Sequence, residues 1–365
     1  MRFAFTEQQT QFRDALRQVL DKECTPDDLR DACNAPMARS RRWATLAEMG
    51  VAGLTVPEAH GGLGLHLLDL APLLEEAGRA ALPEPLIETT ALAAPLLAAF
   101  PSDRVTGWLE AIAGGQITAA VAAIDERGWM AAPTPDGSVV VAADGADLFI
   151  LPAAADPDGR ALELHAVPVA DVSVTSVASL DPTRRLGTVG WEPSPTTLIA
   201  SGDQARSTLG DLAERAAVAT AAELLGLADR MITMAATYAK DRNQFGKPIG
   251  SFQAVKHLLA GAQVKLEFAR PAVYAAAWSL GDPELVGSPQ GARSASLAKA
   301  YASDAATEAA RVSLQVHGAI GYTWECDLHL YLKRAWALAE SWGSAADHRR
   351  RILSSLVDEV RPTQG

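Results

Sequence analysis

The stretch Arg242-Asn-Gln-Phe-Gly-Lys-Pro-Ile-Gly-Ser-Phe-Gln253 constrains the fold and the function of this chain more than any other. Helix-like segments flank it, Ala222 to Lys240 before it and Ala254 to Leu280 after it. A guanidinium, an aromatic ring and an amide therefore lie on one turn between two long helices. Arg242 can bond a pyrophosphate through two N–H groups, and Phe245 can cover an adenine or ribose face. We interpret this turn as a site for a phosphorylated cofactor.

A second motif, Leu314-Gln-Val-His-Gly-Ala-Ile-Gly-Tyr-Thr323, also follows a helix-like segment. Together the two motifs resemble the flavin-binding signatures of the acyl-CoA dehydrogenase superfamily, and the resemblance covers nearly the whole chain. It implies a FAD whose flavin ring sits in a neighbouring subunit. The residues implied to contact the ADP half of that FAD are Arg242, Phe245, Gln253, Gln315 and Gly318.

Glycines in the second motif have a simpler interpretation when they are taken alone. Gly318 and Gly321 could merely end a helix, since glycine is common after a helical run. Ala319 stands where the family usually has a second glycine, which adds a methyl group near the cofactor backbone. The presence of the first motif favours the flavin interpretation.

The composition is typical of a globular protein, with 48% hydrophobic and 21% charged residues. At 365 residues the chain can bury a large core in two or three domains. A formal net charge of −12 argues against a nucleic-acid partner, because such proteins present a basic face. Cys24, Cys33 and Cys326 fit neither a disulfide framework nor a metal site, so a reducing cytoplasm is the simplest interpretation.

No segment of the sequence indicates a membrane anchor. The N-terminus has no apolar region of the kind found in secretory signals. The apolar stretch Ala91 to Phe100 is too short to span a bilayer, which takes about 20 residues. We therefore expect a cytoplasmic protein that does not bind membranes.

Helical and β-like segments follow one another in three blocks. Leu16 and Leu20 recur at helical spacing in the first block. From about Gln116 to Ser201, short β-branched runs are separated by Pro, Gly and Asp, as in a small β-domain. From about Leu212 the helical period returns, and Pro271 should kink one helix or start a new one.

This order matches the three-part plan of the superfamily and predicts an α+β fold that is mainly α. We expect an N-terminal helical domain over residues 1–112 and a small middle β-domain over residues 113–205. A C-terminal four-helix bundle should occupy residues 206–365.

The flavin-ring half of the site departs from the family pattern. Complete enzymes usually have "T-E-P-x-x-G-S-D" at the head of the β-domain, whereas this chain has Thr118-Ala-Ala-Val-Ala-Ala-Ile-Asp125. The next expected element, "W-I-[TS]-N", is also missing, because Val139 to Leu151 contains no tryptophan. Trp129 and Trp191 lie outside the matching position and are expected in the core or at an edge. Burying the polar edge of a flavin without hydrogen-bond partners is costly, so we expect that this β-domain does not hold FAD.

The catalytic base is missing from its usual positions. Dehydrogenation of an acyl-CoA needs a carboxylate that removes the α-proton. In many relatives it is the Glu of "Y-E-G-T", where this chain has Trp342, whose indole accepts no proton. Others carry the base on the helix before the first motif, where an ungapped match gives Ala216. Glu214 would reach that position with a two-residue gap and is the candidate we retain.

The other titratable groups are weaker candidates for a catalytic role. Glu223 and Glu340 are candidate bases by proximity only, and such carboxylates are more often solvated or capping. His257, His317 and His329 form no metal-binding pattern, so we expect surface or packing roles. The basic cluster His348-Arg-Arg-Arg351 is interpreted as a solvated helix face, or as a contact for an acidic partner or a CoA phosphate.

Intact ADP-side motifs, an eroded flavin pocket and a missing base resemble the degenerate chain of actinobacterial α2β2 acyl-CoA dehydrogenases. There, a homologous catalytic chain supplies the base and the flavin pocket. The resemblance implies α,β-dehydrogenation of an acyl-CoA, by analogy a steroid side-chain CoA ester. Electrons would pass to an electron-transfer flavoprotein.

Two alternatives stay open at this point. The chain could form a self-sufficient homotetrameric enzyme that uses Glu214 as its base. It could also be a helical scaffold that has lost flavin, although a scaffold has no physical need for Arg242, Phe245, Gln253 and Gln315.

Overall fold

A computed structural model describes residues 4–34, 41–122, 138–154, 162–282 and 284–360. Its N-terminal part is helical, as the apolar periodicity predicted. The helices are α1 (Glu7–Glu23), α2 (Pro26–Asn34), α3 (Arg41–Glu48), α4 (Leu67–Ala80), α5 (Ala94–Ala98) and α6 (Asp103–Ala113), with a π-helical segment η2 (Ile87–Ala93) before α5. Thr6 begins α1 by accepting a hydrogen bond from the Gln9 backbone N–H.

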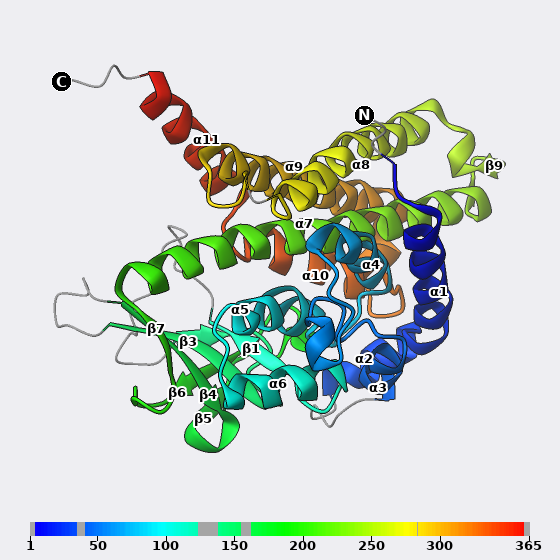
Figure 1. Ribbon diagram of the computed structural model, residues 1–365. Helices are drawn as coiled ribbons and strands as arrows, with labels where there is room; N and C mark the ends of the chain where they lie inside the picture. The colour runs from blue at the N-terminus through cyan, green and yellow to red at the C-terminus, as the bar shows by residue number, and fades with distance from the viewer. Residues whose placement is uncertain (1–3, 35–40, 123–137, 155–161, 283, 361–365) are drawn as a thin grey trace.

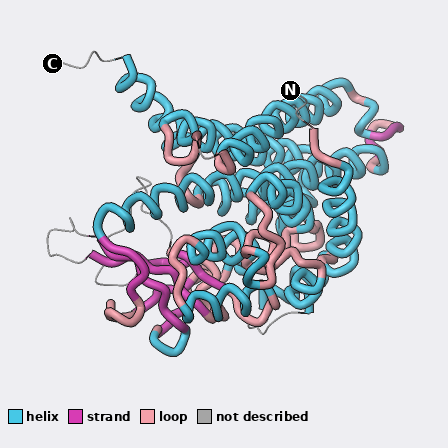
Figure 2. Tube along the Cα trace, in the orientation of Figure 1, coloured by secondary structure: helices cyan, strands magenta, loops and turns pink. Residues whose placement is uncertain are grey.

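Two small sheets follow, gathered at one end of the molecule (Figure 2). The first has the order β1-β3-β4-β7, in which only β1 and β3 are parallel, and the second has the order β2-β6-β5. Their strands are β1 (Ala119–Val121), β2 (Ser138–Val140), β3 (Leu148–Ala154), β4 (Leu162–Pro168), β5 (Ser173–Ser176), β6 (Gly187–Gly190) and β7 (Leu198–Ser201).

Long helices form the rest of the chain. They are α7 (Gly202–Asp241), α8 (Gln253–Ser279), α9 (Pro289–His317), α10 (Leu328–Glu340) and α11 (Ala345–Val360). In Figure 1, α7 crosses the whole molecule, with the sheets and α4 to α6 on one side and α8 and α9 on the other. Helix α8 runs through Pro271 without a break, so of the two alternatives expected there no new helix starts, and a kink stays a prediction.

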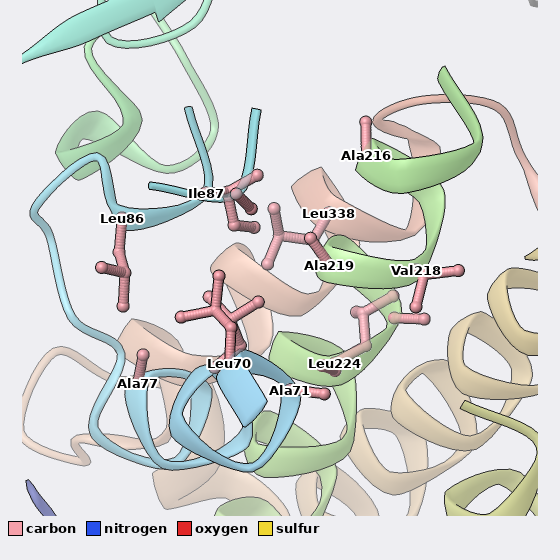
Figure 3. Packing of buried hydrophobic residues seen from close by; sticks show 14 of the residues in the cluster. Leu70, Ala71, Ala77, Leu86, Ile87, Ala216, Val218, Ala219, Leu224 and Leu338 are labelled. Carbon is pink, nitrogen blue, oxygen red and sulfur yellow. The ribbon is translucent and has the colours of Figure 1, made fainter. Parts of the chain in front are cut away.

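The α4–α7 contact is very close because two glycines lie in it. A Cβ on Gly226 of α7 would be 1.8 Å from the Glu75 carbonyl oxygen of α4, and one on Gly78 would be 2.0 Å from the Glu223 carbonyl oxygen. Only glycine permits backbones to approach to this distance. Figure 3 shows the apolar packing beside this contact, where Leu70 of α4 and Leu224 of α7 lie together.

A buried polar contact joins the three parts of the chain. The Arg334 guanidinium on α10 donates to the Asp181 carboxylate and the Thr183 hydroxyl after β5, and to the Leu82 carbonyl oxygen after α4, the last at 2.7 Å. The helical and β elements follow the expected order, while the boundaries at residues 112 and 205 stay predictions. None of the helices in the described ranges is long and apolar enough to cross a membrane.

Candidate functional site

The Arg242–Gln253 stretch forms a hairpin where α7 gives way to α8, far from the sheets (Figure 1). Strands β8 (Asn243–Gln244) and β9 (Lys247–Pro248) flank Phe245 and Gly246, which have φ angles of 54° and 78°. Two consecutive left-handed residues are typical of a type I′ turn, whose preferred sequence is Asn-Gly. A phenylalanine in this conformation is strained, and such strain is concentrated at functional sites. The Phe245 ring is 90% exposed.

Three polar side chains near this hairpin are open to solvent. Arg242, Gln253 and Gln315 are exposed, and within the described ranges their side chains form no ion pair or hydrogen bond. Phe252, which precedes α8, provides no side-chain cap for the helix. A free guanidinium and an uncapped helix N-terminus are both suited to hold a phosphate.

The structure brings the two predicted motifs together through an aromatic pair. Tyr238, one turn before Arg242, stacks on His317, with ring centroids 4.6 Å apart and an interplanar angle of 22°. His317 is fixed in turn by its Nδ1–H, which donates to the Ser313 carbonyl oxygen at 2.7 Å. The expected packing role of His317 is confirmed. Sequence reasoning missed Tyr238, although its spacing of four residues before Arg242 places it on the same face of α7.

Gly318 ends α9, with φ of 64° and its N–H bonded to the Leu314 carbonyl oxygen. The simpler interpretation of this glycine as a helix end is therefore correct, and it is compatible with a role beside a cofactor. The positive φ favours glycine here, and because a Cβ at Gly318 would meet nothing within 4 Å, the space beside it is open.

Trp342 lies inside this chain, with 8% of its surface exposed and φ of 60°. The buried Lys299 ammonium holds the surrounding turn by donating to the carbonyl oxygens of Ala339 and Gly343, at 2.8 and 2.9 Å. From the other side, the His348 Nε2–H donates to the Trp342 carbonyl oxygen at 2.9 Å. Trp342, which the sequence resemblance places at the family's base position, is thus an indole in a braced turn.

The prediction that residues 348–351 form a solvated helix face is wrong for His348, because this side chain is buried against the Trp342 turn. Burial, Lys299 and Arg351 lower the pKa of His348 to about 4, so it stays neutral at pH 7. Burial also lowers the pKa of Lys299 to about 7. Sequence reasoning missed Lys299, whose signal was its place as the one charged residue in the alanine-rich run Ser294 to Ser303.

Glu214 is half-buried on α7, and one of its carboxylate oxygens is buried without a hydrogen-bond partner in the described ranges. Burial, and then the neighbouring Asp211 carboxylate, raise the pKa of Glu214 to about 7, while Arg351 opposes the shift. Ala216 lies about 200° further around the helix and is fully buried. The two side chains therefore face different neighbours, and the match of Glu214 to the base position stays a prediction.

The other two candidate carboxylates differ in burial. Glu340 is exposed, as expected. Glu223 is fully buried, so the expectation that it is solvated or capping was wrong. Its pKa is raised by burial, although the charges of Arg334 and Arg184 oppose the rise. Glu223 thus belongs to the buried charges between the three parts of the chain.

The flavin-ring side contains few polar groups among the described residues. Residues 119–122 are buried apolar side chains of β1 and its end, and Thr118 uses its backbone N–H to bond Asp147 at 2.9 Å. Ala123 to Asp125 and Trp129 lie outside the described residues. Trp191 packs at the edge of the β-domain core, 5.0 Å from His165, as expected. No cluster of metal-ligating side chains occurs in the parts of the chain that are described.

The chain is similar to known proteins over most of its length. The family models for the N-terminal and C-terminal domains of acyl-CoA dehydrogenase match residues 6–116 and 208–357. Acyl-CoA dehydrogenase IpdE2 of Mycolicibacterium smegmatis is 34% identical over 356 residues, which are 96% of this chain and 99% of the relative. The chain belongs to the acyl-CoA dehydrogenase family. This membership confirms the predicted mainly α, α+β fold, and members of the family are FAD-dependent flavoproteins.

Two solved structures of this family extend the likeness. The ChsE4–ChsE5 complex from Mycobacterium tuberculosis has a TM-score of 0.82 at 27% identity and covers 98% of this chain and 99% of the matched chain. A variant of the Tcur3481–Tcur3483 steroid acyl-CoA dehydrogenase has a TM-score of 0.83 at 26% identity, with 97% and 98% covered. Both are named for two different proteins, so acyl-CoA dehydrogenases like this chain occur in heteromeric complexes.

Proposed function

We propose that this acyl-CoA dehydrogenase chain is a half-site subunit that completes the FAD site of a homologous catalytic subunit and lacks a base of its own. One observation carries the proposal. The chain exposes Arg242, Gln253 and Gln315, whose side chains have no partner in the described ranges, while the Trp342 indole is buried at the position that the resemblance gives to the base. Groups that can bind a cofactor's ADP half are present, and the position given to the base holds no proton acceptor.

The exposed groups fit the ADP half of a FAD held by the partner. Arg242 would bind the pyrophosphate through its fork of N–H groups, because no carboxylate in the described ranges occupies it. Phe245 would cover the adenosine, since its strained turn keeps the ring away from the core. Gln253 and Gln315 would donate or accept hydrogen bonds on either side. When bound, FAD supplies the acceptor for the hydride that leaves the β-carbon of the acyl-CoA.

The Trp342 turn supports a non-catalytic role for the same chain. An indole cannot remove the α-proton of an acyl-CoA. Lys299 and His348 fix the backbone on both sides of Trp342, so the turn cannot easily bring another group into its place. A homologous partner subunit would supply the carboxylate.

The relatives support the proposed substrate and the proposed partner. The structures of similar heteromeric complexes support an α2β2 assembly, and the naming of one of them as a steroid enzyme supports a steroid side-chain CoA ester as substrate. An electron-transfer flavoprotein as electron acceptor is carried over from the family resemblance.

A self-sufficient homotetramer is the second candidate, and one observation favours it. Glu214 has a pKa raised to about 7, which suits a general base near neutral pH. Its place on a different face of α7 from Ala216 weighs against this candidate.

The deciding experiment measures flavin absorbance per chain together with oligomer mass, for the chain alone and co-expressed with a fuller homologue. We expect no flavin in the isolated chain and one FAD per unlike pair in an α2β2 complex. One FAD per chain in a homotetramer would contradict the proposal. A colourless α2β2 complex would instead support a scaffold.

A further inference from the structure

A cavity of about 350 Å³ opens between α2, the turn η4 (Pro182–Arg184) and the beginning of α10. It is separate from the Arg242–Gln253 hairpin and does not include Trp342. Contacts between distant parts of the chain hold its walls together: Arg30 with Asp327, Arg185 with the Ala32 carbonyl oxygen, and Arg334 with Asp181. Because each wall is fixed to another, the cavity is a built part of the fold.

The lining of the cavity is mainly apolar. Leu29, Ala81 and Leu330 are buried in its floor, and the Trp324 indole lies at its rim with 73% of its surface exposed. Ligand pockets in proteins span roughly 300–1,000 Å³. This cavity is at the lower end of that range, so it suits a compact one- or two-ring body better than a long chain.

One cation at the rim is available to a ligand. The Lys333 ammonium lies 4.2 Å from the centroid of the Trp324 ring and forms no ion pair in the described ranges. Arg30, the other cation in the lining, is already paired with Asp27 and Asp327. Among the described residues of the lining, Lys333 is therefore the one lysine or arginine without an ion pair, and it lies in the second turn of α10.

His329 provides a second polar position. Its ring lies edge-on to Trp324, with centroids 4.7 Å apart, and its Nε2 atom is buried without a hydrogen-bond partner among the described residues. A buried polar atom without a partner is unfavourable, and each such atom in a native structure calls for an explanation. Burial, Lys333 and Arg30 together lower the pKa of His329. An anion in the cavity would offset the effect of both cations.

We propose that this cavity binds a small monoanion with a planar apolar body, such as an aromatic carboxylate. The ring would lie on Leu29, Ala81 and Leu330, and the carboxylate would pair with Lys333 beside His329. A doubly charged phosphate fits less well, because Arg30, the guanidinium in the described part of the lining, is already neutralised by two carboxylates. The site is independent of the proposed flavin role, since it shares no residue with the ADP-side motifs.

The first test titrates the full-length chain with 2-naphthoate by calorimetry and compares the neutral 2-naphthamide and inorganic phosphate. We expect one saturable site for 2-naphthoate, with binding at least tenfold tighter than that of the other two probes. Lys333→Met should weaken 2-naphthoate binding at least fivefold. The matched control is Arg104→Met, because the Arg104 guanidinium lies 4.7 Å from the Trp108 ring centroid in a similar cation–indole pair elsewhere. It should leave binding unchanged.

The second test locates the probe through Cys33, which lines the cavity and is half-buried. Cys24 should stay unmodified, because burial raises its thiol pKa to about 12. In a Cys326→Ser background, 2-naphthoate should slow the reaction of Cys33 with N-ethylmaleimide at least fivefold. Filling the cavity by Cys33→Phe should abolish binding without lowering the melting temperature of the chain by more than a few degrees.

Three results would overturn the proposal. These are no 2-naphthoate binding at millimolar concentration, binding that Lys333→Met leaves unchanged, and binding that does not protect Cys33. Tighter binding of inorganic phosphate than of 2-naphthoate would contradict the class of ligand.

Discussion

Tyr238 and His317 stack with their ring centroids 4.6 Å apart, although 79 positions separate them in the sequence. The pair joins the end of α7 to the end of α9, directly beside Arg242 on one helix and Gly318 on the other. Two motifs that lie far apart along the chain thus become parts of one surface. We expect the spacing of the two motifs in the folded protein to depend on this contact.

Replacing Tyr238 tests whether the stack sets that spacing. Tyr238→Leu should lower the free energy of unfolding by about 1 kcal/mol, as expected for a lost aromatic pair. It should also weaken FAD binding by the complex by about threefold to tenfold, because the Arg242 and Gln315 groups lose their common support. Tyr238→Phe keeps the ring and should change neither quantity. Equal FAD affinity in the Leu and Phe variants would show that the stack is purely structural.

Arg242 is expected to act on the cofactor alone, since its side chain is exposed and unpaired among the described residues. Arg242→Ala should weaken FAD binding by about 1.5–3 kcal/mol, the usual value of a hydrogen bond to a charged group. Arg242→Lys should weaken FAD binding less than Arg242→Ala does, because an ammonium keeps the charge and loses the two-pronged geometry. Flavin absorbance per complex measures the effect, and the melting temperature of the chain should not change.

Lys22→Ala is the control for Arg242, because it removes an equal charge from the exposed last turn of α1. It should leave the flavin content unaltered. If Lys22→Ala and Arg242→Ala reduced flavin content equally, the effect would belong to net charge, and a pyrophosphate contact at Arg242 would be excluded.

Local periodicity and turn chemistry made the order of elements predictable. Apolar spacing placed α1, and glycine-containing turns marked the two motifs, because these signals depend only on neighbouring residues. The surroundings of Trp342 were not predictable in this way. Lys299 and His348 reach that turn from two different helices, and their roles depend on how α9 packs against α11. The spacing of residues in the sequence does not show how these two helices pack, so the sequence predicted that His348 belongs to a solvated face.

Lys299 should make stability depend on pH in the alkaline range. Burial lowers its pKa from an ordinary 10.5 to about 7 in the folded chain. Between these values the unfolded chain binds a proton that the folded chain does not, so stability increases as pH rises from 7 towards 10.5. The slope should approach about 1.4 kcal/mol per pH unit in that window. Urea unfolding at pH 7.5, 8.5 and 9.5 measures it.

Lys299→Met should remove this part of the slope while leaving the Ala339 and Gly343 carbonyl oxygens without their donor. Lys265→Met is the matched control, because Lys265 is an exposed lysine on α8 and should keep the wild-type slope. Parallel stability curves for wild type and Lys299→Met would show that Lys299 is charged in the folded chain at all three pH values.

Glu214→Gln separates the two candidate functions by measuring stability and turnover together. Burial and Asp211 raise the pKa of Glu214 from an ordinary 4.5 to about 7. Between these values the folded chain holds a proton that the unfolded chain releases, so this group's contribution to stability is lost as pH rises from 4.5 to 7. Glutamine is neutral at every pH, and the variant should therefore exceed the wild type in stability at pH 8 by about 1–3 kcal/mol.

Turnover of the complex should be unchanged, because the proposed base belongs to the partner. Loss of a general base costs roughly 100-fold to 10,000-fold in rate, so a fall of that size with FAD still bound would establish Glu214 as the base and the chain as a self-sufficient enzyme. Asp211→Asn provides the control: it removes the neighbouring charge that helps to raise the Glu214 pKa, and it should bring the pH at which stability is lost down towards 4.5 without affecting turnover.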